Sequence, residues 1–177
     1  NKDLDYAIIE INSISENFDN KKIVIATQLI DQVLKECKIE SYKLVKKIKG
    51  KEFKETICSH PFENLGYQYD VPMLEATFVT LEQGTGFVHC APSHGPDDFN
   101  LCLQHGIKSL DTIDDDGRYT KHIKKFEGIH IFKADQIVIE NLKDCKKLLS
   151  NGKLTHSYPH SWRSKAPLVH RATSQWF

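Results

Sequence analysis

The amino-acid sequence predicts an α+β fold rich in β-structure, in which an antiparallel or mixed, barrel-like sheet carries a few peripheral helices. Two observations predict it. Many short β-branched or apolar runs are separated by turn residues, and a few helical segments lie between them, two of which have apolar residues at helical spacing. A doubly wound parallel sheet is not expected. The 177 residues, 40% of them hydrophobic, suffice for one sizeable core, so we expect one compact domain over residues 1–177.

Two strands and a helix are expected near the N-terminus. Residues 6–11 and 22–26 are short β-branched runs with turn residues between them, which is typical of two strands. Apolar residues then recur at helical spacing over residues 28–37, and Thr27 is in position to cap that helix. We expect the apolar side of this helix to face the core.

Two further strand pairs are predicted in the middle of the chain. Residues 42–49 and 52–56 flank a Gly-Lys pair, which is typical of a lysine-rich hairpin whose polar side chains face water. Residues 74–81 and 86–90 are apolar runs separated by the sequence EQGT, and they indicate another pair.

Two helices and an irregular tail complete the chain. Residues 96–105 can form a helix, because Pro96 stands at the first turn, two acidic residues follow near its positive end, and Gly106 comes after its close. An apolar stripe predicts a longer helix over residues 133–150, ended by Gly152. The tail mixes β-forming residues with prolines, which indicates strands interrupted by a loop.

The charge balance weighs against a stand-alone protein that binds nucleic acid tightly. Lys plus Arg and Asp plus Glu both total 24, so there is no overall positive field to attract a polyanion. Positive charge is concentrated locally, in residues 35–54 and 161–177, and the ordinary explanation of such runs is a solvated face.

The cysteines and the N-terminal sequence predict the compartment. Five cysteines without a C-x-x-C pair fit reduced thiols better than a disulfide framework. The N-terminal residues lack the pattern of a secretion signal, and no run approaches the roughly 18 apolar residues of a membrane span. We therefore expect a cytoplasmic protein that is not embedded in a membrane.

The segment from Gly84 to Phe99, GTGFVHCAPSHGPDDF, concentrates the residues that can carry chemistry. Its glycines permit close backbone approach to a ligand, but it lacks the spacing of a phosphate-binding P-loop or a dinucleotide fingerprint. His89 ends the predicted strand and Asp98 lies in the first turn of the next helix, so the turn could bring both side chains to one rim. The spacing leaves open two structural explanations, a helix cap for Asp98 and a core histidine for His89.

The same segment resembles the signature of the editing insertion of isoleucyl-tRNA synthetases, which are class I aminoacyl-tRNA synthetases. The family is matched in order by VPMLEATFVTLEQ before the segment and by DTIDDDGRYT, FEGIHIFKADQIVIENL and THSYPHSWRSKAPLVHRATSQWF after it. The resemblance covers nearly all of residues 66–177, whereas the first 60 residues match loosely. Related valyl and leucyl enzymes generally lack a histidine at the position of His89, so this residue favours the isoleucyl branch.

The resemblance implies roles for individual residues. As candidate catalytic residues, Asp98 would bind the α-ammonium group of the misattached amino acid, and His89 would line the pocket for the aminoacyl group and the terminal adenosine. The candidate substrate-binding residues are Gly84, Thr85, Gly86, Val88 and His94. Core packing is an equally good explanation of Val88. Because aspartate is a weak base at neutral pH, we expect Asp98 to position the ester rather than to take a proton. The water could be activated by His89, by a ribose hydroxyl of the substrate, or by positioning alone.

The resemblance implies post-transfer editing, in which the ester bond between misattached valine and the isoleucine tRNA is hydrolysed. Hydrolysis of valyl-adenylate is a further implied activity. A synthetic pocket separates isoleucine from valine by one methylene, worth about 1–3 kcal/mol, a limit for which isoleucyl-tRNA synthetases are the usual example. A second pocket that excludes isoleucine overcomes this limit. Two alternatives stay open: the editing domain of a valyl-type enzyme, and a catalytically incomplete fragment that only binds the 3′ end of the tRNA.

The resemblance also implies a larger parent enzyme. The sequence contains neither the HIGH nor the KMSKS signature, so we expect no ligase activity from it; ATP and Mg would serve the parent enzyme, and editing would need no cofactor. We expect an excised piece without the synthetic Rossmann domain, the anticodon-binding domain and the Thr-rich strand that precedes it in the family. The expected partners are the 3′ end of the isoleucine tRNA and the other domains in cis, with no membrane and a monomeric state.

No bound metal is expected. Some family members carry cysteines on either side of the Trp-Arg pair near the C-terminus, where this sequence has Ser161 and Ser164. The remaining candidates lack the spacing of a structural zinc site; they are His156, His160, Cys58 and His60.

Overall fold

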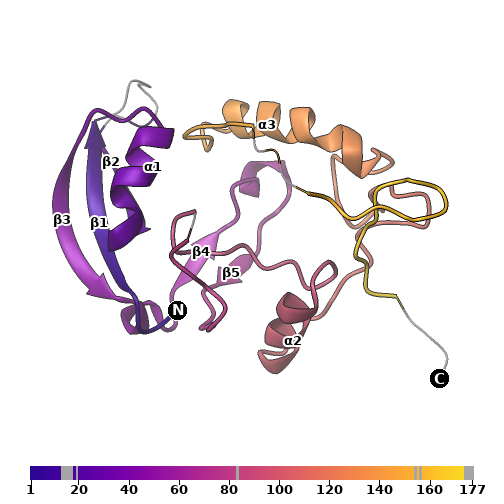
Figure 1. The fold of residues 1–177 in the computed structure, drawn as a ribbon, viewed down its shortest axis with the longest axis horizontal. Coiled ribbons are helices and arrows are strands. Elements are labelled where there is room, and N and C mark those ends of the chain that lie inside the picture. Colours follow the sequence, from indigo (N-terminus) through magenta and orange to yellow (C-terminus); the bar gives the residue numbers. More distant parts are fainter. Residues whose placement is uncertain (13–17, 19, 83, 154, 156, 174–177) are drawn as a thin grey trace. The chain divides into compact units, whose positions relative to one another are not determined.

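The computed structural model describes residues 1–12, 18, 20–82, 84–153, 155 and 157–173 (Figure 1). The chain divides into two compact units. The first comprises Asn1–His89 with Leu142–Asn151, and the second comprises Cys90–Asn141 with Gly152–Phe177. The expectation of a single editing domain over residues 1–177 stays a prediction.

A three-stranded antiparallel sheet is the centre of the first unit. Strand β1 (Asp5–Asn12) lies between β2 (Lys21–Ala26) and β3 (Ser41–Lys49). The register between β1 and β3 shifts between Ile8 and Ile9. Both strands predicted before residue 27 are therefore confirmed, and they pair with each other.

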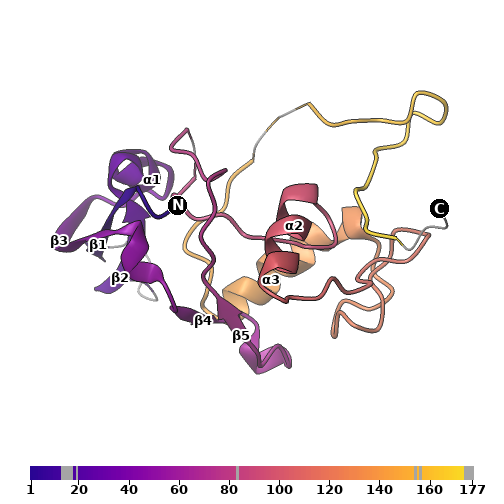
Figure 2. The ribbon, with the colours of Figure 1, turned by 90° about the horizontal axis from the view of Figure 1, so that it is seen from below.

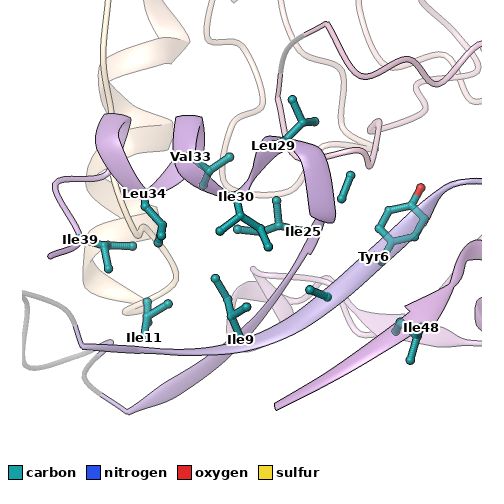
Figure 3. Packing of buried hydrophobic residues seen from close by; sticks show 12 residues of the cluster. Tyr6, Ile9, Ile11, Ile25, Leu29, Ile30, Val33, Leu34, Ile39 and Ile48 are labelled. Atoms are coloured by element: carbon teal, nitrogen blue, oxygen red, sulfur yellow. The ribbon is translucent and has the colours of Figure 1, made fainter. Parts of the chain in front are cut away.

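One helix covers a face of this sheet (Figure 3). Helix α1 (Ile30–Glu36) follows a 3-10 turn at Thr27–Leu29 and buries its apolar side, as its spacing predicts. Removal of this apolar surface from water is the main force that orders the unit. The buried core residues are Tyr6, Ala7, Ile9, Ile11, Ile25, Ala26, Leu29, Ile30, Val33, Leu34, Ile39 and Ile48.

The prediction that Thr27 caps α1 is wrong. Neither the 3-10 turn nor the helix begins with a side-chain capping hydrogen bond, and the Thr27 hydroxyl is buried without a hydrogen-bond partner among the described residues. Leu29 and Ile30 are both buried at the helix start. Their burial outweighs a cap worth about 1 kcal/mol, so packing rather than capping determines where the helix begins.

The lysine-rich hairpin predicted for residues 42–49 and 52–56 does not form. Strand β3 pairs with β1 instead, and the chain then turns through a 3-10 segment at Gly50–Phe53. An isolated hairpin is marginal in water, whereas β1 offers β3 the edge of a strand that is already buried. The predicted exposure of the lysines is confirmed, because Ile48 is the one buried residue of β3.

A two-stranded antiparallel ribbon follows in the first unit. Strand β4 (Ile57–Ser59) pairs with β5 (Asp70–Pro72). The strands predicted for residues 74–81 and 86–90 are absent from the described residues, which form loops here, and Gly84 and Gly86 have positive φ. The antiparallel sheets confirm the α+β class, but the described residues form no closed barrel, so that part of the prediction is not confirmed.

Two helices are prominent in the rest of the chain. Helix α2 (Pro96–Gln104) begins with proline, as predicted. Helix α3 (Ala134–Asp144) ends earlier than the predicted residue 150, because Lys146 adopts a positive φ of 55°. Leu149, which the prediction placed in the same helix, packs against the core of the first unit instead.

The tail consists mainly of loops, as Figure 2 shows for the yellow end of the ribbon. Among the described tail residues, the predicted strands reduce to one isolated bridge between His160 and Pro167. No helix in the described part of the chain is both long enough and apolar enough to cross a membrane.

Truncation of Ile9 is expected to destabilise the first unit. Ile9 is completely buried, so Ile9→Ala leaves a cavity and should lower the free energy of unfolding by about 2–5 kcal/mol. Ile57→Ala is the control, because Ile57 is 59% exposed and should cost less than about 1 kcal/mol. Urea titrations of both variants measure the difference. Equal losses would contradict the assignment of the core.

Candidate active site

The signature segment contributes residues to both units. The division between the units falls between His89 and Cys90, so residues 84–89 belong to the first unit and residues 90–99 to the second. The prediction that His89 and Asp98 share one rim therefore concerns two units and stays a prediction.

Gly86 is fixed against the sheet by close packing. The Tyr6 hydroxyl donates a hydrogen bond to the Gly86 carbonyl at 2.8 Å, and the Ala26 amide donates to the Thr85 carbonyl at 2.8 Å. A Cβ atom at Gly86 would lie 2.5 Å from the Ala26 Cβ and 3.2 Å from the Tyr6 ring, and φ at Gly86 is +83°. Both space and backbone conformation require glycine here, so the fold alone accounts for this residue.

The other candidates in this half of the segment are exposed. Gly84 has φ of +80° and nothing within 4 Å of an added Cβ. Val88 is 51% exposed, which argues against the core-packing explanation of this residue. Thr85 and His89 are exposed as well, so His89 is not a core histidine. These four residues are accessible to a ligand.

The Asp98 carboxylate holds the loop before α2 in place. Its Oδ2 atom accepts a hydrogen bond from the Ala91 amide at 3.0 Å. Helix α2 has Gly95 as its N-cap and no side-chain capping hydrogen bond, so Asp98 does not act as a helix cap. A Cβ atom at Gly95 would lie 3.1 Å from Asp98 Oδ2, so glycine leaves room for this carboxylate. Asp98 is half-buried, whereas Asp97 is exposed.

Cys90 lies beside the same carboxylate. Burial, the negative charge of Asp98 and the neighbouring Cys102 together raise the pKa of the Cys90 thiol to about 11. Burial and Asp98 also raise the pKa of the Cys102 thiol. Both cysteines are therefore protonated at neutral pH and are poor nucleophiles. Of these three side chains, the Asp98 carboxylate is the best candidate for contact with a substrate.

His94 is held by the protein on both sides of its ring. Nδ1 lies 2.9 Å from the His170 carbonyl oxygen and Nε2 lies 2.8 Å from the Thr112 hydroxyl. A carbonyl only accepts, so Nδ1 carries the proton and, in the neutral ring, Nε2 accepts from Thr112. Both nitrogens are thus engaged in the fold, which favours a structural role over the predicted contact with substrate.

Ser93 and Arg171 extend this junction between the turn and the tail. The Ser93 hydroxyl donates to the Leu110 carbonyl at 2.5 Å, and the Ser93 carbonyl accepts from the Ala172 amide at 2.8 Å. Arg171 forms an ion pair with Asp115 and donates to the Ile113 carbonyl at 3.0 Å. No local sequence pattern predicts these contacts of Ser93 and Arg171. Both residues lie within stretches that match the family, GTGFVHCAPSHGPDDF and THSYPHSWRSKAPLVHRATSQWF.

A cleft of about 570 Å³ lies beside this junction within the second unit. It is lined by residues 92–96 at the start of α2 and by residues 170–173 of the tail, and His94 is among them. Asp98 does not line it, because its carboxylate is turned toward Ala91.

Among the residues that the structure describes, the candidate metal ligands are not gathered together. In the part of the chain that the structure describes, no group of three or more His, Cys, Asp or Glu side chains could hold a metal ion. His156 lies outside the described residues. His160 Nδ1 lies 2.8 Å from the Tyr158 carbonyl oxygen, and His60 Nδ1 accepts from the Phe62 amide.

Comparison with known proteins assigns the chain to a family. Residues 6–145 match the family described as "Leucyl-tRNA synthetase, editing domain". The match covers most of the chain, so the chain belongs to this family of editing domains of aminoacyl-tRNA synthetases.

Individual relatives identify the branch that the chain resembles. It is 70% identical over 177 residues to an isoleucine–tRNA ligase of Pelagibacter ubique, covering 100% of this chain and 19% of the relative. It is 40% identical over 189 residues to that of Gluconobacter oxydans, covering 99% of this chain and 20% of the relative. The chain thus spans about a fifth of the length of these relatives. The resemblance to isoleucyl editing insertions is confirmed, and it includes the first 60 residues.

Alanine at Gly86 is expected to destabilise the fold more than alanine at Gly84. Both residues have positive φ, which costs a residue with a Cβ about 1–2 kcal/mol, but only Gly86 also lacks space. Gly86→Ala should therefore lower the free energy of unfolding by about 2–5 kcal/mol, and Gly84→Ala by about 1–2 kcal/mol. Denaturant titration of both variants checks this. If Gly84→Ala were the more damaging change, the packing of Gly86 against Tyr6 would be refuted.

Alkylation rates test the contact between Asp98 and Cys90. With a thiol pKa of about 11, roughly one Cys90 in a thousand is a thiolate at pH 8, so iodoacetamide should modify it far more slowly than the exposed Cys58. Asp98→Asn removes the negative charge, lowers the pKa of Cys90 and should accelerate its alkylation. Mass spectrometry over time measures both rates. An unchanged Cys90 rate in Asp98→Asn would show that the two groups are not neighbours.

Proposed function

We propose that the chain carries out post-transfer editing, in which it hydrolyses the ester bond between valine and the isoleucine tRNA. The observation that carries the proposal is the match to isoleucine–tRNA ligases along the whole chain, within a family of editing domains. Valyl-adenylate is a second substrate of the proposed site. The reaction consumes water alone, so the proposal includes no cofactor and no metal.

The choice of valine follows from the limit of binding selectivity. One methylene changes the binding free energy by about 1–3 kcal/mol, too little for accurate protein synthesis, and an editing pocket that admits only the smaller side chain corrects the error. The proposed partners are accordingly the 3′ end of the isoleucine tRNA and the remaining domains of the parent synthetase.

Asp98 is the residue that we propose holds the substrate's α-ammonium group. The hydrogen bond from Ala91 fixes the orientation of the carboxylate, and a carboxylate has about four acceptor sites, so this bond leaves capacity for an ammonium group. A charge-assisted hydrogen bond to the ammonium would fix the ester carbonyl for attack by water. Asp98 thus acts by positioning and not by taking a proton.

His89 is the second proposed residue, and it contacts the aminoacyl group and the terminal adenosine. The His89 side chain is exposed in the first unit, which supports access by a ligand. Gly84, Thr85 and Val88 are exposed beside it and complete the proposed wall of the pocket. Water attacks the ester carbonyl, the carbon–oxygen bond to the ribose breaks, and the ribose hydroxyl leaves with a proton. His89, a substrate hydroxyl, or positioning alone activates the water in this proposal.

Single-turnover deacylation in the full-length protein tests the function and the role of Asp98 together. The wild-type protein should hydrolyse Val-tRNA much faster than Ile-tRNA. Asp98→Ala should slow the hydrolysis of Val-tRNA roughly 100-fold or more, because the ester is no longer positioned. Asp98→Asn keeps an acceptor for the Ala91 amide but loses the charge, so it should also be strongly impaired.

Asp97→Ala is the matched control for this experiment. Asp97 precedes Asp98 by one residue, points about 100° away around the helix and is exposed, so the variant should retain activity. Melting temperatures of all variants separate catalysis from stability. Equal losses at Asp97 and Asp98, or a loss that follows unfolding, would remove the proposed role. Tight binding of tRNA without deacylation by the wild-type protein would favour a module that only binds the 3′ end.

A further inference from the structure

Four aromatic side chains gather at one end of the β4–β5 ribbon in the first unit. We call this set, which consists of His60, Phe62, Tyr67 and Tyr69, the ribbon-end cluster. His60 directly follows β4 and Tyr69 directly precedes β5, and the pair Ser59–Asp70 closes the ribbon next to them. The connecting loop folds Tyr67 back so that its ring stacks on His60, with centroids 4.9 Å apart and an interplanar angle of 18°.

The cluster holds Tyr69 in a defined position. The Tyr69 ring lies 5.3 Å from the His60 ring and 6.5 Å from the Tyr67 ring, the latter in an edge-to-face arrangement. The Phe62 amide donates to His60 Nδ1 at 3.0 Å, which fixes the orientation of the imidazole and leaves the proton of the neutral ring on Nε2. Tyr69 therefore rests on rings that are themselves fixed.

Internal packing explains only part of this arrangement. Phe62 is 7% exposed and serves as the core of the loop. Tyr69 is 56% exposed although its ring lies against the rings of His60 and Tyr67. Rigid aromatic rings with an open side are the feature with which proteins bind unpaired bases, because every base has a face that can stack.

The position of the cluster connects it with the candidate active site. Burial lowers the pKa of His60, and the positive charge of His89 lowers it further, so the two histidines lie within electrostatic range of each other. The proposed function assigns the terminal adenosine to the pocket beside His89. The next nucleotide of the single-stranded 3′ end would then extend away from His89 within reach of the cluster.

We propose that Tyr69, supported by His60 and Tyr67, stacks the base of the nucleotide that precedes the terminal adenosine of the bound tRNA. The inference rests on the proposed function, because that function defines where the terminal adenosine lies. Stacking at this point fixes the direction of the strand, and so helps to hold the ester in place without touching it. Tyr69 is a binding residue in this role and not a catalytic one.

Fluorescence of a modified tRNA tests the proposal in the full-length protein. The probe is uncharged tRNA that carries 2-aminopurine in place of the base before the terminal adenosine, and stacking on Tyr69 should quench it. Tyr69→Ala and Tyr69→Leu should both lose the quenching and bind roughly 5- to 150-fold more weakly, since one stacked base contributes that much. Tyr69→Leu retains apolar contact with the cluster, so it guards against a simple loss of folding. Tyr69→Phe keeps the ring and should behave as the wild type does.

Tyr42→Ala provides the control, because Tyr42 is an exposed tyrosine on β3 outside the cluster, and it should bind and quench normally. Unchanged binding and quenching in Tyr69→Leu would overturn the proposal. So would a loss in Tyr69→Phe as large as that in Tyr69→Ala, since the hydroxyl would then carry the contact. The probe contains no ester, so normal quenching by a wild-type protein that fails to deacylate Val-tRNA would refute the proposed function and leave the stacking role intact.

Discussion

The packing of the Tyr6 ring beneath the loop at Gly86 is the constraint on which the first unit depends. Tyr6 is 1% exposed and its ring contacts Phe53 and Phe87, so it belongs to the core, and its hydroxyl also binds the loop at Gly86. Its hydroxyl would be costly to bury unpaired, and the Gly86 carbonyl satisfies it. The same apolar burial that forms the sheet therefore also determines where the chain leaves it toward His89.

In the second unit, polar groups rather than apolar ones hold the loop before α2 in position. The turn that leads into α2, residues 91–96, contains two prolines and a glycine, and the one buried residue among these six is the polar Ser93. Hydrogen bonds hold this turn instead: Asp98 binds the Ala91 amide, Ser93 binds the Leu110 carbonyl, and His94 bridges Thr112 and His170. The loop before α2, which the Asp98 carboxylate contacts through Ala91, is thus held by hydrogen bonds to several other segments of the second unit.

The sequence predicted best where one periodic pattern coincided with one buried face. Strand β1 follows from its run of β-branched residues and helix α1 from its apolar spacing, and the proline at the start of α2 locates that helix. Long-range competition was not visible in the pattern: β3 prefers the edge of β1 to its own neighbour in sequence. In the candidate site, too, local patterns were predictable from the sequence and long-range contacts were not. The motif led to Asp98 and His89, but the partners of His94 lie 18 and 76 residues away, and the sequence contains no local sign of such contacts.

Strand β3 lies at the edge of its sheet, and this arrangement bears on how the protein behaves when molecules meet in a crowded solution. An edge strand presents unpaired backbone groups, and a second sheet can add to them and begin an aggregate. The side chains along β3 include four lysines, and of its nine residues only Ile48 is buried. Two such edges brought together would align like charges before the backbones could pair. The lysine run therefore keeps the open edge of the sheet solvated, even in a chain whose net charge is zero.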